Sequence, residues 1–197
     1  MYSRLLFVLL LLLSSKVMAY EEAIYKIVFQ NNIYEIRSYS QRLAVQVSYN
    51  KEGSGFRKLF NYISGSNLDT TKINMTTPVT QSKKISMTIP VTDTNENGNK
   101  VMQFYLPSKF TIENAPIPND KDVELLIVEK GHYAVIKYSG RLTLNNFYKH
   151  SKILKDNLLK DDLEILGSAV RATYNSPFTL PFLRRNEVMF LVNWDNR

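Results

Sequence analysis

Apolar and polar residues alternate along two short stretches that share one pattern, residues 75–79 (MTTPV) and 87–91 (MTIPV). A period of two residues is typical of a strand with one buried face. Because the polar residues 81–84 separate the two stretches, the pattern predicts a β-hairpin. Proline within both strands withholds a ladder hydrogen bond, which favours a strongly curved sheet over a flat one.

The chain contains one order of predicted elements twice. Residues 42–47 and 132–137 are strand patterns with a shared Ala-Val pair, so that Ala44 and Ala134 stand ninety residues apart. Each strand is followed by a turn with glycine and then by a helical pattern with one apolar stripe. The duplication predicts that Ala44 and Ala134 occupy equivalent places in the two halves.

Both helices can be placed from their apolar spacing. The first helix has its stripe at positions i, i+3, i+4 and i+7, which are Phe56, Leu59, Phe60 and Ile63. The second helix has its stripe between Leu144 and Leu158, and Thr143 is its expected N-cap.

Two strands are expected after each helix: the two Met-Thr-x-Pro-Val stretches in the first half, and residues 169–174 with 187–192 in the second. Residues 101–105 form a further strand in the connector between the halves. Each sheet face and helix stripe needs a partner against which to bury. The sequence therefore predicts an α+β fold, in which duplicated strand-helix-strand-strand units form one distorted antiparallel β-barrel flanked by two helices.

The first nineteen residues have the layout of a signal peptide. Arg4 precedes the apolar run of residues 5–13, and Val17-Met18-Ala19 fits a small-residue cleavage site. A membrane-spanning helix needs about 20 apolar residues, so this run is too short, although a retained anchor is the alternative. We expect residues 1–19 to be removed and residues 20–197 to form a single domain. That domain would be exported, periplasmic in a Gram-negative host and otherwise secreted, without stable membrane insertion.

Composition narrows the classes of function. The formal net charge is +7, but lysine and arginine are spread along the chain, so we expect no nucleic-acid partner. We also expect a monomer. The absence of cysteine excludes covalent haem attachment through C-x-x-C-H and thiolate chemistry. Metalloprotease, nucleophile-elbow and phosphate-loop motifs are all missing from the sequence, and we therefore do not expect an enzyme.

Six further motifs occur in a fixed order along the chain. They are Tyr34-Glu35-Ile36-Arg37-x-Tyr39, Phe56 to Asn67 (FRKLFxYIxGxN), Lys72 to Val79 (KIxMTxPV), Phe104-Tyr105-Leu106-Pro107, Tyr174-Asn175-Ser176-Pro177 and Arg184-Arg185-Asn186-Glu187-Val188. This ordered set resembles the SOUL family of haem-binding proteins and covers roughly Ile24 to Val192. The resemblance implies a domain that holds a tetrapyrrole in a groove near the first helix.

The candidate binding residues lie on and after that helix. Phe56, Phe60 and Ile63 supply an apolar wall, and Arg57 and Lys58 could bind the two propionates. Met75 completes the set of cofactor contacts: Phe56, Arg57, Lys58, Phe60, Ile63 and Met75. The expected ligand is haem b or another porphyrin, bound non-covalently. Alternatively, the aromatic stripe is core and the two cations are ordinary surface charges.

Axial ligands for iron are scarce. Some members of the family carry histidine at the position of Ser38. His132 and His150 are the two histidines of the chain and are weak candidates for metal ligands. Arg184 and Arg185 could form an anion site, but an ion pair between Glu187 and one arginine, which stabilises the fold, is the favoured interpretation.

The sequence thus predicts an exported tetrapyrrole-binding protein for haem buffering, scavenging or transfer. Two alternatives use the same scaffold. One is an effector-binding module for small hydrophobic molecules, and the other is a hydrolase, which would need a carboxylate inside the cleft.

Cleavage of the leader can be tested directly. We expect the protein isolated from its host to begin at Tyr20, because the small residue Ala19 precedes it. Intact-mass measurement distinguishes this product from the full chain, and a mass that retains residues 1–19 would contradict the prediction.

Overall fold

The computed structural model describes residues 21–194, except 52, 69–84, 86–87 and 97–98. Its helices are α2 (Ser54–Ile63) and α3 (Leu144–Lys160), with a short 3-10 helix η1 (Pro181–Leu183). Its strands are β1 (Glu21–Glu22), β2 (Tyr25–Gln30), β3 (Glu35–Tyr39), β4 (Arg42–Tyr49), β5 (Asn67–Leu68), β6 (Thr88–Ile89), β7 (Val91–Glu96), β8 (Asn99–Tyr105), β9 (Ile117–Pro118), β10 (Val123–Val128), β11 (Gly131–Tyr138), β12 (Val170–Thr173) and β13 (Asn186–Val192).

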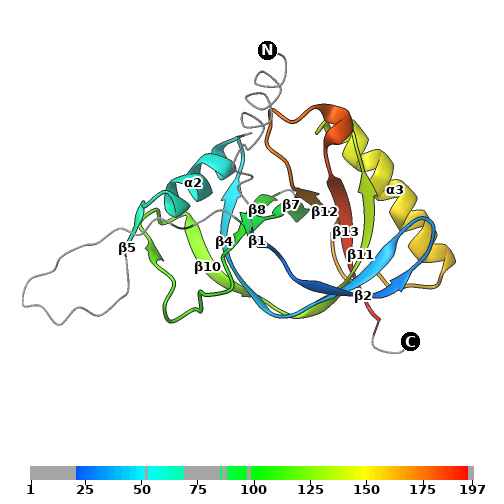
Figure 1. Ribbon diagram of the computed structural model, residues 1–197, viewed down its shortest axis with the longest axis horizontal. Coiled ribbons are helices and arrows are strands. Elements are labelled where there is room, and N and C mark those ends of the chain that lie inside the picture. The colour runs from blue at the N-terminus through cyan, green and yellow to red at the C-terminus, as the bar shows by residue number, and fades with distance from the viewer. Residues whose placement is uncertain (1–20, 52, 69–84, 86–87, 97–98, 195–197) are drawn as a thin grey trace, which may run out of the picture.

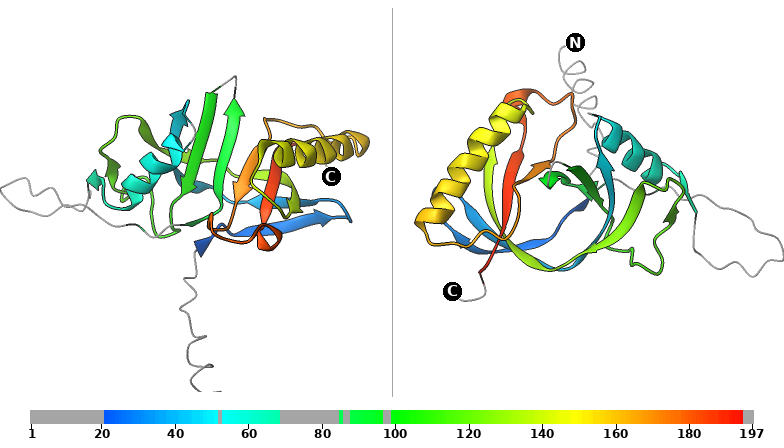
Figure 2. Two further views of the ribbon diagram at one scale, coloured as in Figure 1. Left: turned by 90° about the horizontal axis from the view of Figure 1, so that it is seen from above. Right: turned by 180° about the vertical axis from the view of Figure 1, so that it is seen from behind.

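Nine of these strands form one antiparallel sheet in the order β10-β4-β8-β7-β12-β13-β11-β3-β2. The sheet is curled into a half-barrel, and α2 and α3 lie on its outer side, one against each limb (Figure 1, Figure 2). The predicted α+β class with two flanking helices is confirmed. The sheet remains open, with β10 and β2 as its two edges. Among the described residues, no helix combines the length and hydropathy that crossing a membrane requires.

The pairing of the strands confirms the duplication. β3 leads directly into β4 but pairs with β11, whereas β10 leads into β11 but pairs with β4. Within each half, the strand before the helix pairs with the last strand, as in β4 with β8 and β11 with β13. The pair β7–β12 joins the halves at the centre of the sheet. Each half therefore contributes a strand to the other, and the two halves form one interlocked body.

In the equivalent strands β4 and β11, the positions that face the helix are offset by one residue. Val45 and Val47 of β4 belong to the core beneath α2, whereas Ala134 and Ile136 of β11 belong to the core beneath α3. Side chains alternate between faces along a strand. Ala44 therefore faces the inside of the curl and Ala134 faces its helix, so the predicted equivalence of these two alanines is wrong by one position.

The strands that follow α2 also differ from the prediction. β7 and β8 take the places that β12 and β13 take in the second half. The second Met-Thr-x-Pro-Val stretch contributes only the two residues of β6, which pair in parallel with β1, and the beginning of β7. Pro90 separates β6 from β7 because it has no N–H group to donate. The first stretch, with Met75, lies outside the described residues.

Each helix buries one stripe against its limb of the sheet. Leu59, Tyr62 and Ile63 of α2 pack in the first core, and Leu154 and Leu158 of α3 pack in the second. As predicted, Thr143 is the N-cap of α3, and its side chain accepts a hydrogen bond from the backbone N–H of Asn146 at 3.2 Å.

Candidate functional site

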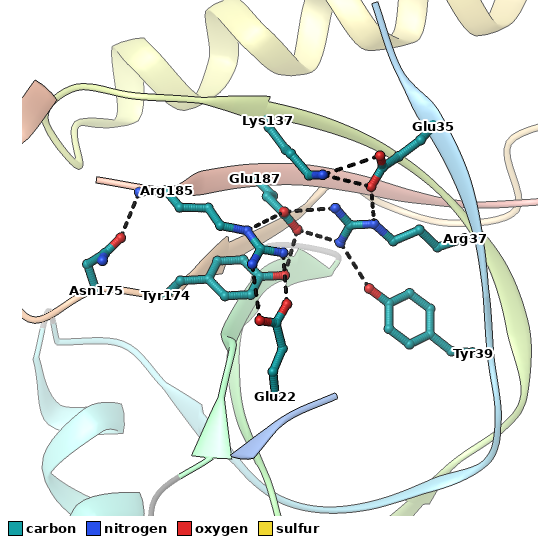
Figure 3. A network of polar contacts seen from close by, with 9 residues as sticks. All are labelled: Glu22, Glu35, Arg37, Tyr39, Lys137, Tyr174, Asn175, Arg185 and Glu187. Carbon is teal, nitrogen blue, oxygen red and sulfur yellow. Dashed lines mark hydrogen bonds and ion pairs between the residues drawn. The ribbon is translucent and has the colours of Figure 1, made fainter. Parts of the chain in front are cut away.

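A network of charged side chains is buried on the inner face of the curled sheet (Figure 3). Its centre is Arg37 of β3 and Glu187 of β13, whose side chains have no exposed surface. The guanidinium donates from Nη1 and Nη2 to the two carboxylate oxygens, with both distances at 2.8 Å. This bidentate geometry is the strongest form of carboxylate pairing in proteins.

Four other side chains complete the hydrogen bonding of this pair. Arg185 Nε donates to Glu187 Oε1 at 2.9 Å, and Tyr174 Oη donates to Oε2 at 2.6 Å. On the other side, Arg37 Nε donates to Glu35 Oε1 at 2.5 Å, and Nη1 also donates to Tyr39 Oη at 3.1 Å. All six residues belong to the quoted motifs, and the four charged ones, Glu35, Arg37, Arg185 and Glu187, neutralise one another.

The environment keeps Glu187 ionised. Burial alone would raise the pKa of this carboxyl, but the guanidinium of Arg37 and the hydroxyl of Tyr174 outweigh burial and lower the pKa. Burial raises the pKa of Tyr39 to about 12, so its hydroxyl stays protonated. Because the carboxylate is charged and its oxygens are occupied, the network is suited to holding strands together and not to proton transfer. The predicted ion pair between Glu187 and an arginine is confirmed, although its principal partner is Arg37.

The predicted binding residues on α2 do not gather in one place. Phe56 and Phe60 are 41% and 45% exposed, and their rings stack with centroids 5.9 Å apart. Phe56 also contacts the buried Phe104 edge-on at 5.4 Å. Ile63 belongs to the core beneath the helix. The helix thus presents a two-ring apolar patch beside its buried stripe.

Of the two cations of α2, Lys58 lies on the far side of the helix from that patch. Lys58 forms ion pairs with Asp122 and with Asp120, the latter at 3.3 Å, and these contacts raise the pKa of Lys58. At 100° per residue, Lys58 lies about 200° around the helix from Phe56. Arg57 is exposed on the solvent side. Lys58 is therefore poorly placed to bind a propionate of a macrocycle that rests on Phe56.

The two histidines lie at opposite ends of β11. His132 begins the strand, directly across from Ser38 in the register. His150 of α3 stacks on Tyr138 at the other end, with centroids 4.0 Å apart, and its Nδ1 lies 2.8 Å from the carbonyl oxygen of Asn146. Six residues of strand separate the two ends by about 20 Å, so these histidines cannot ligate one iron together. The described residues contain no cluster of three or more side chains able to hold a metal ion.

A broad groove runs along the outer face of the sheet beside α3, with a volume of about 1180 Å³. One wall is the flank of α3, with Leu144, Phe147, Tyr148 and Leu159 among its residues. Strands β7, β8 and β12 form the floor, and Tyr49 and Gly53 stand at the far side, near the start of α2. Leu144, Tyr148 and Leu159 are each at least half exposed, and together they line one groove, as is typical of a contiguous apolar patch that a ligand or partner covers.

Charged groups cross the floor of this groove. Asp93 of β7 accepts a hydrogen bond from Tyr49 Oη at 2.9 Å and forms an ion pair with Arg171 of β12. Lys100 of β8 and Lys155 of α3 add cations at the floor and the wall. These residues come from five elements, so the local sequence pattern does not bring them together. Only the apolar residues at helical spacing on the flank of α3 left a local signal.

The comparisons with known proteins agree with this fold. The profile described as SOUL heme-binding protein matches residues 20–191, and the chain therefore belongs to the SOUL family. A search of curated proteins found no match.

Similar solved structures share the architecture at low sequence identity. A hydrolase from Listeria innocua has a TM-score of 0.56 and 11% identity over 84% of this chain and 94% of its own. The C-terminal domain of EcmrR has a TM-score of 0.56 and 9% identity over 86% of this chain and 98% of its own. At such identities the likeness shows the fold alone.

The central ion pair makes a prediction about stability. Glu187→Gln should lower the free energy of unfolding by about 3–5 kcal/mol near neutral pH, because Arg37 would remain buried without its main counter-charge. Since the folded pKa of Glu187 is lowered, its contribution is fully present above the unfolded value near 4.5 and is lost as the pH falls through the folded pKa. The variant should therefore be less sensitive to acid below about pH 4.5 in urea unfolding.

Asp156→Asn provides the matched control. It removes a carboxylate from an exposed i,i+4 pair with Lys152 and should cost only about 0.3–0.5 kcal/mol. If the two variants are equally destabilised, the buried pair does not have the importance assigned to it.

Proposed function

We propose that this protein binds haem or a related tetrapyrrole non-covalently, in the groove between α3 and strands β7, β8 and β12. The size and apolar lining of the groove carry this proposal. Cofactor sites usually have about 300–1,000 Å³ of mostly apolar space. The groove reaches about 1180 Å³, whereas two other cavities have only about 140 and 310 Å³. Membership of the SOUL heme-binding family supports the same ligand.

The groove offers partners for the two ends of such a ligand. The apolar flank of α3 suits the flat face of a macrocycle, and burial of its surface is worth roughly 25 cal/mol per Å² before the costs of association. Lys100 and Lys155 can pair with the propionates from the floor and the wall. Exposed pairs of this kind add only about 0–1 kcal/mol each. Affinity would therefore come mainly from apolar burial.

Iron ligation plays a small part in this proposal. No histidine lines the groove, where Met102 and the tyrosines Tyr49 and Tyr148 are the side chains of types known to ligate haem iron. The protein would thus accept other porphyrins, including the metal-free form. The predicted leader, residues 1–19, supports a role outside the cytoplasm in the capture or buffering of haem.

Two other functions use the same fold. Solved neighbours include structures titled hydrolases and the EcmrR C-terminal domain, and the groove contains the carboxylates of Asp93 and Glu164. However, Asp93 already pairs with Arg171 and accepts from Tyr49, so it is a poor candidate for a general base. Glu164 is exposed and accepts a hydrogen bond from Asn193 at 2.9 Å. We therefore propose a binding protein and not an enzyme.

Two matched substitutions distinguish the groove from the aromatic patch on α2. Leu159→Asp in the groove should weaken haemin binding at least tenfold, whereas Phe60→Asp on α2 should change it less than threefold. Both side chains are about half exposed, at 58% and 45%, so the variants should fold. Titration of the Soret band measures both affinities. Leu183→Asp, at an exposed site outside the groove, controls for the added charge.

If Phe60→Asp weakens haemin binding more than Leu159→Asp does, the site lies at α2, as predicted from the sequence. A wild-type protein that gives no Soret shift with haemin would remove the proposed function and favour the effector-binding alternative.

The weak role of histidine can be tested separately. Replacement of both His132 and His150 by alanine should leave haemin affinity within about tenfold, a change of roughly 1.4 kcal/mol. The affinity of this double variant for metal-free protoporphyrin should change equally little, because neither histidine lines the groove. If the double variant loses its Soret band and its affinity for haemin but still binds metal-free protoporphyrin, one of the two histidines holds the iron.

A further inference from the structure

A second cavity lies on the inner face of the sheet, where strands β4, β7 and β8 face β11 and β12. Its volume is about 140 Å³, and its polar lining includes Arg42, Gln46, Thr92, Gln103, Tyr105 and Tyr133. Gln103 Nε2 donates to Gln46 Oε1 at 2.8 Å, which fixes the two amides against the wall. Inner and outer residues alternate along the strands, so this cavity and the groove beside α3 occupy opposite faces of one sheet.

Arg42 is held rigidly at this cavity. Its guanidinium carbon lies 4.2 Å from the ring centroid of Tyr39 and 4.3 Å from that of Tyr105. The two rings cover the faces of the guanidinium, which leaves its N–H donors to act in its own plane. The Nε atom is buried and has no hydrogen-bond partner in the described part of the structure. Because this atom has almost no accessible surface, an anion in the cavity would have to accept from the terminal nitrogens Nη1 and Nη2 of Arg42.

The charge of Arg42 is also unbalanced locally. It is the one charged residue among the residues that line the cavity. The adjacent network does not supply a counter-charge, since Glu187 is occupied by Arg37 and Arg185, and Glu22 pairs with Arg185. An anion in the cavity would therefore meet a partly buried cation without a carboxylate partner among the described residues, and a charge-assisted hydrogen bond to it is stronger than a neutral one.

We propose that this cavity binds a small monocarboxylate, whose oxygens accept hydrogen bonds from Arg42. The volume sets the size, because a cavity of about 150 Å³ accommodates benzene. Val101, Val170 and Met189 provide an apolar surface for the remainder of the molecule, and Tyr133 flanks it. This site is independent of the tetrapyrrole groove, and either site could exist without the other.

Benzoate and benzamide test this proposal as a charged and a neutral probe of one shape. In the wild-type protein at constant ionic strength, benzoate should bind at least tenfold more tightly than benzamide by calorimetric titration. Benzoate should also shift the NMR signal of the Arg42 Nε–H group, which Arg42→Gln identifies by its disappearance. Arg42→Gln should weaken benzoate binding at least tenfold. Arg141→Gln, which removes one exposed positive charge elsewhere, should change it less than twofold.

Each measurement can overturn the proposal. Equal binding of benzamide, an unmoved Arg42 Nε–H signal or an equal loss in Arg141→Gln would each overturn the proposal. If Arg42→Gln does not fold, the wild-type comparison of the two probes and the NMR signal still test it. Haemin titration in the presence of saturating benzoate should be unchanged, which separates a failure of this site from a failure of the groove.

Discussion

The buried pair of Arg37 and Glu187 is the constraint on which the architecture depends. It joins β3, near the beginning of the described chain, to β13 at its end, and each partner has its charge removed from water. Such a pair stabilises a fold only if every other hydrogen-bonding position is occupied. Glu35, Tyr39, Tyr174 and Arg185 occupy those positions, so the network specifies which strands meet on the inner face of the sheet.

The pleat of the curled sheet separates two surfaces with different chemistry. Alternate residues of β7 and β8 face outwards to a broad groove with an apolar wall from α3, or inwards to a small polar cavity around Arg42. Both helices lie on the outer side, which leaves the inner face to strands and their side chains (Figure 1). A single sheet can therefore offer a wide site to a flat apolar ligand and a narrow site to an anion.

Local pattern was sufficient for much of the fold. The 3.6-residue stripe and the N-cap Thr143 located α3, and the repeated strand-helix order indicated the duplication. Pairing across the halves was beyond local pattern, because β3 pairs with β11, in which the partner residues are 92 to 100 positions away. The same limit hid the groove, whose walls and floor come from α3, several strands and the segment 163–169. It also hid the place of Arg42, which reads in sequence as an ordinary residue at the start of a strand.

The exchanged strands have a consequence for the origin and assembly of the chain. One half alone would leave its first strand without a partner, since β3 pairs with β11 and β10 pairs with β4. Two copies of a single half could satisfy each other in the same way, as an obligate homodimer whose stability depends on its concentration. In the present chain the segment between β8 and β10 links the two halves covalently. Their association is therefore intramolecular, and the stability of the fold does not depend on protein concentration. The molecule thus has the topology of a dimer of one strand-helix-strand-strand unit within a single polypeptide.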